Sequence, residues 1–113
     1  MTERGLITRI QIMTIVSVHH TKKNEGIHQN GLLQKLSIIY GKGVNAKQLK
    51  PHTDWLQEHY YVNELRVSVR KVLEPTPEGI AFITNLPSDL TQIERVNEYY
   101  DRVDRLFEKV EYL

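Results

Sequence analysis

Residues 45–75 read NAKQLKPHTDWLQEHYYVNELRVSVRKVLEP, and their pattern changes partway along. Asn45 is a good N-cap residue, and Leu49 and Leu56 follow at helical spacing, so the first half predicts a helix. Pro51 falls in its second turn, where the missing N–H and the ring clash predict a kink or a later start. Residues 60–75 are rich in Tyr and Val and predict two strands joined by a turn within residues 63–68.

Two helices are expected before this stretch. Apolar side chains between Leu6 and Val18 form a wide helical stripe, although their partial alternation keeps a strand possible. Residues 19–30 are polar and predict a loop, with a short strand at Ile27 as an option. Leucine, isoleucine and tyrosine over residues 32–40 predict a second helix that ends at Gly41, and a turn follows over residues 41–43.

The C-terminal third predicts a short helix and then a long one. Pro77 suits the first position of a helix over residues 77–85, which Pro87 breaks. Ser88 or Asp89 is expected to cap the last helix, with the side chain of residue 92 completing a capping box. This helix would be a rod of roughly 25 residues, about 38 Å long. Its apolar residues follow a heptad-like 3-4-3-4-3 spacing: Ile93, Val96, Tyr100, Val103, Phe107 and Val110.

Length and composition bound the class of protein. The 113 residues allow one small core, and the absence of cysteine excludes disulfides, thiolate zinc sites and cysteine nucleophiles. The longest apolar stretch, residues 10–18, is far shorter than the ~20 residues that a membrane span needs. The expectation is a soluble cytoplasmic protein, associated with the nucleoid if it binds DNA.

The net charge of +1 conceals two oppositely charged parts of the chain. Residues 1–73 hold eleven Lys and Arg against five Asp and Glu, a net charge of +6. Residues 74–113 hold four Lys and Arg against nine Asp and Glu, a net charge of −5. A basic body with an acidic tail indicates a polyanion-binding surface in the body, with chance as the alternative.

The order helix, helix, turn, helix, hairpin resembles a winged helix-turn-helix domain. Residues 45–62 resemble the recognition-helix stretch of bacterial and archaeal winged-helix regulators. Thr76-Pro77-Glu78-Gly79 resembles the signature that closes the wing in PadR-like and MarR-like proteins, although Pro75 separates it from Leu73. The following long helix is similar to the dimerisation helix of PadR-like and replication-terminator-like proteins.

This resemblance implies a mostly helical α+β fold. A winged-helix DNA-binding domain would span residues 1–86, with a two-stranded wing, and a coiled-coil-type dimerisation helix would span residues 87–113. In that plan the third helix, about residues 45–59, enters the major groove, and the wing, about residues 61–75, lies on the DNA backbone.

Eight residues are candidates for DNA contact. On the third helix, side-chain amides can pair with adenine, and cations can reach guanine or phosphate. The alternative is that these polar residues form an ordinary solvent-exposed helix face. The cations of the wing also suit the protection of a sheet edge. The candidates are Asn45, Lys47, Gln48, Lys50, His52, Arg66, Arg70 and Lys71.

The heptad residues are candidates for dimerisation. One exposed stripe of six apolar residues favours aggregation, so pairing with a second copy, in an antiparallel or bundle-like manner, is the expected solution. The alternative is that the last helix folds back onto the first helix of its own chain.

The first hypothesis for function is a homodimeric, sequence-specific double-stranded DNA-binding protein that regulates transcription. The alternatives are DNA binding in replication control, plasmid partition or chromatin architecture, and a winged-helix module that binds another protein. No enzymatic activity, metal or cofactor is expected, because no catalytic motif is present and the five histidines lack ligand spacing. The sequence does not identify an effector.

Overall fold

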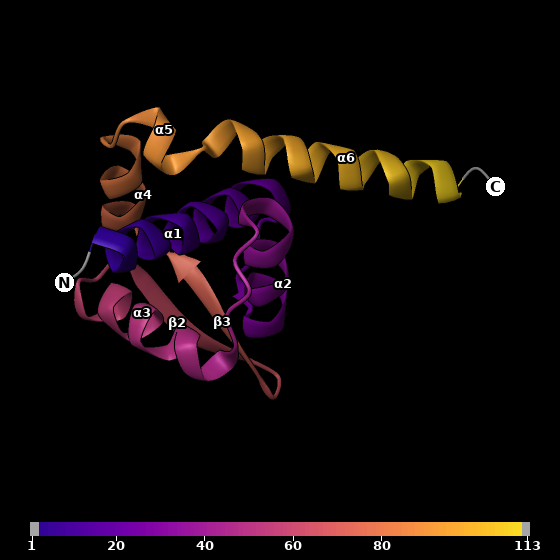
Figure 1. The fold of residues 1–113 in the computed structure, drawn as a ribbon. Helices are drawn as coiled ribbons and strands as arrows, with labels where there is room; N and C mark the ends of the chain where they lie inside the picture. The colour runs from indigo at the N-terminus through magenta and orange to yellow at the C-terminus, as the bar shows by residue number, and fades with distance from the viewer. Residues whose placement is uncertain (1–2, 112–113) are drawn as a thin grey trace.

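The computed structural model describes the backbone of residues 3–111 and the side chains of residues 5–109. The chain is a mostly helical α+β fold with a small antiparallel sheet (Figure 1). In chain order its elements are α1 (Glu3–Lys23), β1 (Ile27–His28), α2 (Gln29–Tyr40), α3 (Ala46–Glu58), β2 (Val62–Val67), β3 (Arg70–Pro75), α4 (Pro77–Thr84), α5 (Ser88–Thr91) and α6 (Ile93–Glu111).

Helix α1 is the centre of the core. It runs through the middle of the molecule, with α6 along one side and α2, α3 and the sheet on the other (Figure 1). Ile12, Met13, Ile15 and Val16 are completely buried, as expected for a helix that is covered on more than one face. The predicted helix is therefore confirmed, but it continues to Lys23, so the loop expected from residue 19 begins five residues later.

The next two helices begin and end as their cap residues predict. Helix α2 ends at Gly41, whose left-handed backbone (φ 68°) suits glycine. Helix α3 begins directly after Asn45 in spite of Pro51, so the expected later start is wrong. Pro51 has no N–H to donate to the carbonyl of Lys47, one turn earlier. Both residues lie on the exposed side of α3, where water can donate to this carbonyl instead.

The sheet has the order β1-β3-β2, and all pairings are antiparallel. The short strand β1 at Ile27 is confirmed. The β2–β3 turn is formed by Ser68, the last residue of the predicted window, and Val69, one residue beyond it, with Ser68 in a left-handed conformation (φ 61°). The register pairs Arg66 with Lys71 and Val67 with Arg70.

The C-terminal region has a break that the sequence did not reveal. Thr76 caps α4 through its hydroxyl, and Pro87 precedes α5. Gln92 then adopts a left-handed conformation (φ 50°) and separates α5 from α6, so the expected single rod and its capping box are wrong. Helix α6 has 19 residues, about 28 Å at 1.5 Å per residue.

The first half of α6 packs on α1 within the same chain. Val96 and Tyr100 are buried in the common core, and Ile93 packs against it. The Tyr100 hydroxyl lies 2.5 Å from Nδ1 of His19. The alternative in which the last helix folds back onto the first therefore describes this half.

The division into domains at residue 87 remains a prediction. None of the helices within residues 3–111 is long and apolar enough to cross a membrane.

Candidate nucleic-acid interface

The start of α3 is held by a reciprocal capping box. The Asn45 side chain accepts a hydrogen bond from the Gln48 backbone N–H at 2.8 Å, and the Gln48 side chain accepts one from the Asn45 N–H at 3.0 Å. Both side-chain oxygens are therefore engaged in capping. A bidentate contact with adenine needs the amide oxygen as well as the NH₂ group, so neither residue is available for one in this conformation.

The exposed side of α3 carries two lysines near its N-terminal end. Lys47 is exposed, and Lys50 forms an ion pair of 2.7 Å with Asp54 one turn later. A hydrogen bond to Asp54, and then its charge, raise the pKa of Lys50. Glu58 is also exposed, so positive charge is concentrated in the first half of α3 and negative charge in the second.

The β2–β3 hairpin adds cations beside α3. Arg66 and Lys71 are directly opposite in the register, and directly opposite residues lie on the same face of an antiparallel sheet. Two cations in this position repel each other, which makes a bound anion favourable there. Arg70 belongs to the other face because neighbouring residues of a strand alternate. It lines another cleft, together with Lys71, His28 of β1 and Asn30 of α2.

A cleft of about 430 Å³ separates α3 from the sheet. Lys47 and Lys50 line it from α3, and Lys71 lines it from β3. Asp54 and Glu64 also line it, so the cleft carries both charges. Lys47 and Lys50 lie toward the start of α3. We call the surface formed by Lys47, Lys50, Arg66 and Lys71 the α3–hairpin face.

His52, also predicted to contact DNA, lies on the opposite side of α3 from this cleft. It is half-buried, and its Nδ1 accepts a hydrogen bond of 3.2 Å from Nε of Arg9 on α1. Burial lowers the pKa of His52, and the charges of Arg9 and Lys42 lower it further. No local pattern in the sequence indicates this cluster, because Arg9 and Lys42 are 43 and ten residues away from His52.

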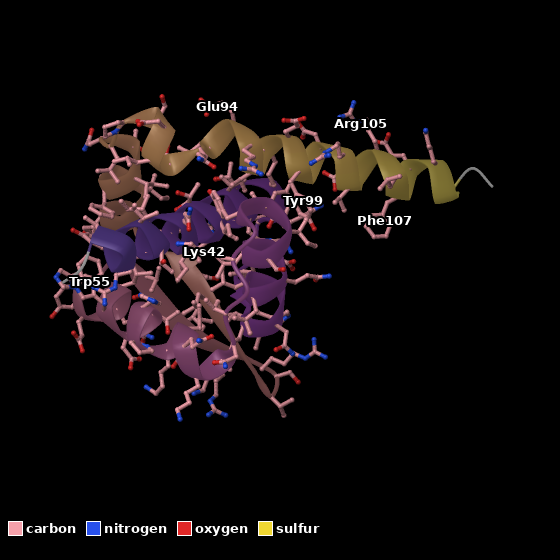
Figure 2. The ribbon with its side chains drawn as sticks, viewed as in Figure 1. Lys42, Trp55, Glu94, Tyr99, Arg105 and Phe107 are labelled. Atoms are coloured by element: carbon pink, nitrogen blue, oxygen red, sulfur yellow. The ribbon has the colours of Figure 1, made fainter. Side chains whose placement is uncertain are left out.

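The heptad residues fall into two groups. Val96 and Tyr100 are buried against α1 and cannot also contact a partner, whereas Phe107 is 66% exposed. Val103 is half-buried, the neighbouring Leu106 is exposed, and the Val110 side chain lies outside the described residues. We call residues 103–109 the α6 overhang, because this part of the helix extends beyond α2 (Figure 1). Phe107 points to the side of α6 that faces the body, and Arg105 points away from it (Figure 2).

The two charged parts of the chain are separated in space. Helix α6 lies at the opposite end of the molecule from α3 and the hairpin turn (Figure 1). Several nitrogen-bearing side chains project from α3 and the hairpin at that far end (Figure 2). Lys22 and Lys23 at the end of α1 instead form ion pairs with Asp101 and Asp104 of α6, at 2.9 and 2.5 Å. The uncompensated positive charge is thereby shifted toward α3 and the hairpin.

Comparison with solved structures identifies a protein of similar fold, entitled "Crystal structure of SSV1 F-93". The superposition has a TM-score of 0.50 at 21% sequence identity and covers 81% of this chain and 91% of the other. No protein-family model matches the chain, and no curated protein matches its sequence. At this level of identity the similarity concerns the fold, and the element order and small antiparallel sheet are consistent with a winged helix.

Proposed function

We propose that this chain is a homodimeric winged-helix protein that binds double-stranded DNA and regulates transcription. The observation that carries the proposal is the convergence of four cations from three elements, α3, β2 and β3, on the α3–hairpin face. An α-helix fits the major groove, which is about 12 Å wide, and the flanking hairpin would then reach the phosphate backbone. The acidic α6, at the other end of the molecule, would be kept away from the DNA.

The mode of sequence recognition differs from that expected from the sequence alone. Because Asn45 and Gln48 cap α3, direct base contacts fall to Lys47 and Lys50, with Arg66 and Lys71 on phosphate. Lys50 would exchange its ion pair with Asp54 for DNA, at little cost because exposed ion pairs contribute about 0–1 kcal/mol.

The dimer is proposed to form through the α6 overhang. The apolar stripe that packs on α1 at Val96 and Tyr100 continues through the half-buried Val103 to Phe107, which the described part of the chain leaves 66% exposed. A second copy offers the same stripe under a two-fold axis, so each copy covers the other. Two α3–hairpin faces would then bind two half-sites of a pseudo-palindrome.

Binding of duplex DNA over a range of salt concentrations tests the proposal. The variant Lys47→Ala/Arg66→Ala/Lys71→Ala should reduce the slope of log K against log salt by up to about 0.9 for each lost phosphate contact. The control, Arg102→Ala/Arg105→Ala/Lys109→Ala, removes the same charge from α6 and should leave the slope nearly unchanged. Equal effects of the two variants, or a wild-type protein that does not bind duplex DNA, would reject the proposal.

The alternatives differ in what they predict for the cell and for the oligomeric state. DNA binding in replication, plasmid partition or chromatin architecture predicts many dispersed or clustered genomic sites, whereas a regulator predicts few. The exposed Phe107 and Leu106 equally suit a protein-interaction module. In that case the purified chain would be a monomer that pairs with a different protein.

A further inference from the structure

A second cleft, of about 640 Å³, lies on the side of α3 away from the sheet. It is bounded by α1, by the loop between α2 and α3, and by α3 itself. The residues that line it are Gly5, Thr8, Gly41, Lys42, Gly43, Val44, Gln48 and His52. None of these residues is acidic, in contrast to the cleft on the sheet side, which contains Asp54 and Glu64.

Two basic side chains, Lys42 and His52, line this cleft, and a third, Arg9, contacts His52. The Lys42 Nζ donates a hydrogen bond of 2.7 Å to Oγ1 of the buried Thr8, which directs the ammonium group toward α1. The guanidinium of Arg9 lies 4.8 Å from the centre of the Trp55 ring and donates to Nδ1 of His52. All three are half-buried, so the charges of Lys42 and Arg9 are less screened by solvent than those of extended surface lysines.

The hydrogen bond from Arg9 determines which atom of His52 can donate. An arginine Nε always carries a proton, so Nδ1 of His52 is the acceptor and the neutral ring carries its proton on Nε2. Among the residues whose side chains the structure describes, the charged groups that act on His52 are the cations Arg9 and Lys42. An anion in the cleft would receive hydrogen bonds from a lysine ammonium and from an imidazole N–H.

We infer that this cleft binds a phosphate group, with Lys42 and His52 as its donors and Arg9 positioning the His52 ring. The inference rests on the proposed function, because the most direct source of the phosphate is DNA. A helix in the major groove lies between two phosphate strands. Lys71 would reach one strand from the sheet side of α3, and Lys42 and His52 would reach the other. A free phosphate-bearing molecule has the same chemistry, so the experiment separates the two sources.

The first arm uses inorganic phosphate and NMR of His52 in the full chain. Phosphate should shift the His52 ring signals and raise the pKa of this histidine toward its ordinary value. Lys42→Gln should weaken phosphate binding about tenfold, since a charge-assisted hydrogen bond is lost. Lys42→Arg, which keeps the charge, and Lys109→Gln on α6 should bind phosphate as the wild type does. Absence of the shift in the wild type, or equal binding by Lys42→Gln, would overturn the inference.

The second arm uses duplex DNA. If the phosphate belongs to DNA, Lys42→Gln should lower the salt slope by about 0.9, and Lys109→Gln should not. A phosphate effect in the first arm with an unchanged slope would assign the cleft to a free phosphate-bearing ligand. The proposed function is rejected by a different result, namely equal effects on the salt slope of Lys47→Ala/Arg66→Ala/Lys71→Ala and of its control variant on α6. If the first arm is negative and the slope is unchanged, the phosphate site is rejected and the proposed function stands.

Discussion

His19 on α1 and Tyr100 on α6 are 81 positions apart in the chain and are joined by a hydrogen bond of 2.5 Å in the core. The Glu25 carboxylate lies 3.5 Å from the other ring nitrogen of His19. The Lys35 ammonium lies 5.6 Å from the centre of the Tyr100 ring. This polar cluster fixes α6 on the body, and it therefore determines the direction in which the α6 overhang leaves it.

Replacement of Tyr100 by Phe should destabilise the fold without emptying the core. The ring is retained, but a nitrogen of the buried His19 loses its partner, which costs about 1–3 kcal/mol. Urea denaturation of Tyr100→Phe measures the loss. The matched control is Tyr60→Phe, since Tyr60 is 77% exposed and should lose almost nothing. Equal stabilities of the two variants would show that the His19–Tyr100 bond contributes nothing.

The stability of the protein should fall as the pH falls below the pKa of an unperturbed histidine. Burial, and then the charge of Lys35, lower the pKa of His19 to about 4 against an opposing effect of Glu25. The unfolded chain has an ordinary histidine pKa of about 6.5 and binds more protons than the folded chain between these values. This contribution is therefore complete above about pH 6.5 and is lost as the pH falls toward 4.

The loss between about pH 7.5 and 4.5 should be on the order of 2 kcal/mol. Urea denaturation at the two pH values measures it. His19→Gln should remove most of this dependence, because glutamine does not titrate, whereas His20→Gln should preserve it. A wild-type protein with the same pH dependence as His19→Gln would contradict the prediction.

Gly79→Ala should be severely destabilising. A Cβ atom on Gly79 would lie 2.1 Å from the carbonyl oxygen of Tyr61 and 2.6 Å from Cε of Met13. The first of these atoms is backbone, so α4 would have to move away from the segment that joins α3 to β2, and we expect a loss of about 3 kcal/mol or more. Gly43→Ala is the control, since a Cβ there meets no atom within 4 Å. Thermal unfolding of both variants is the check, and near-equal melting temperatures would refute the close approach.

Phe107→Glu should convert the proposed dimer to a monomer that remains folded. Phe107 is 66% exposed within the chain, so a charge there costs the monomer little, but it would be buried without a partner in the dimer. Light scattering after size-exclusion chromatography gives the mass. Val69→Glu changes an exposed apolar residue of the hairpin turn in the same way and should leave the mass unchanged. A Phe107→Glu protein that is still dimeric would exclude the overhang as the interface.

Local signals in the sequence were sufficient for much of the fold. Gly41, Asn45 and Pro77 predicted where helices end or begin, because the requirements of helix ends are met by residues close in sequence. The left-handed break at Gln92 had no such signal. Glutamine rarely adopts this conformation, and here tertiary contacts accompany it, including the hydrogen bond from the Tyr40 hydroxyl to the Thr91 carbonyl.

The candidate site was predicted less well than the fold. Residue type and position identified Lys47 and Lys71, which do line one cleft. Spacing alone did not reveal that Asn45 and Gln48 use their side chains on each other, because an N-cap residue and a base-reading residue have the same chemistry. The contact of Arg9 with His52 depends on the packing of α1 against α3, which no local pattern encodes.

Backbone amide NMR during a titration with duplex DNA shows whether the α3–hairpin face binds double-stranded DNA. The largest changes in chemical shift are expected in the first half of α3 and in the hairpin around Arg66 and Lys71. The exposed side of α6 should change little. Changes concentrated on α6, or no changes at salt concentrations that permit phosphate binding, would contradict this expectation.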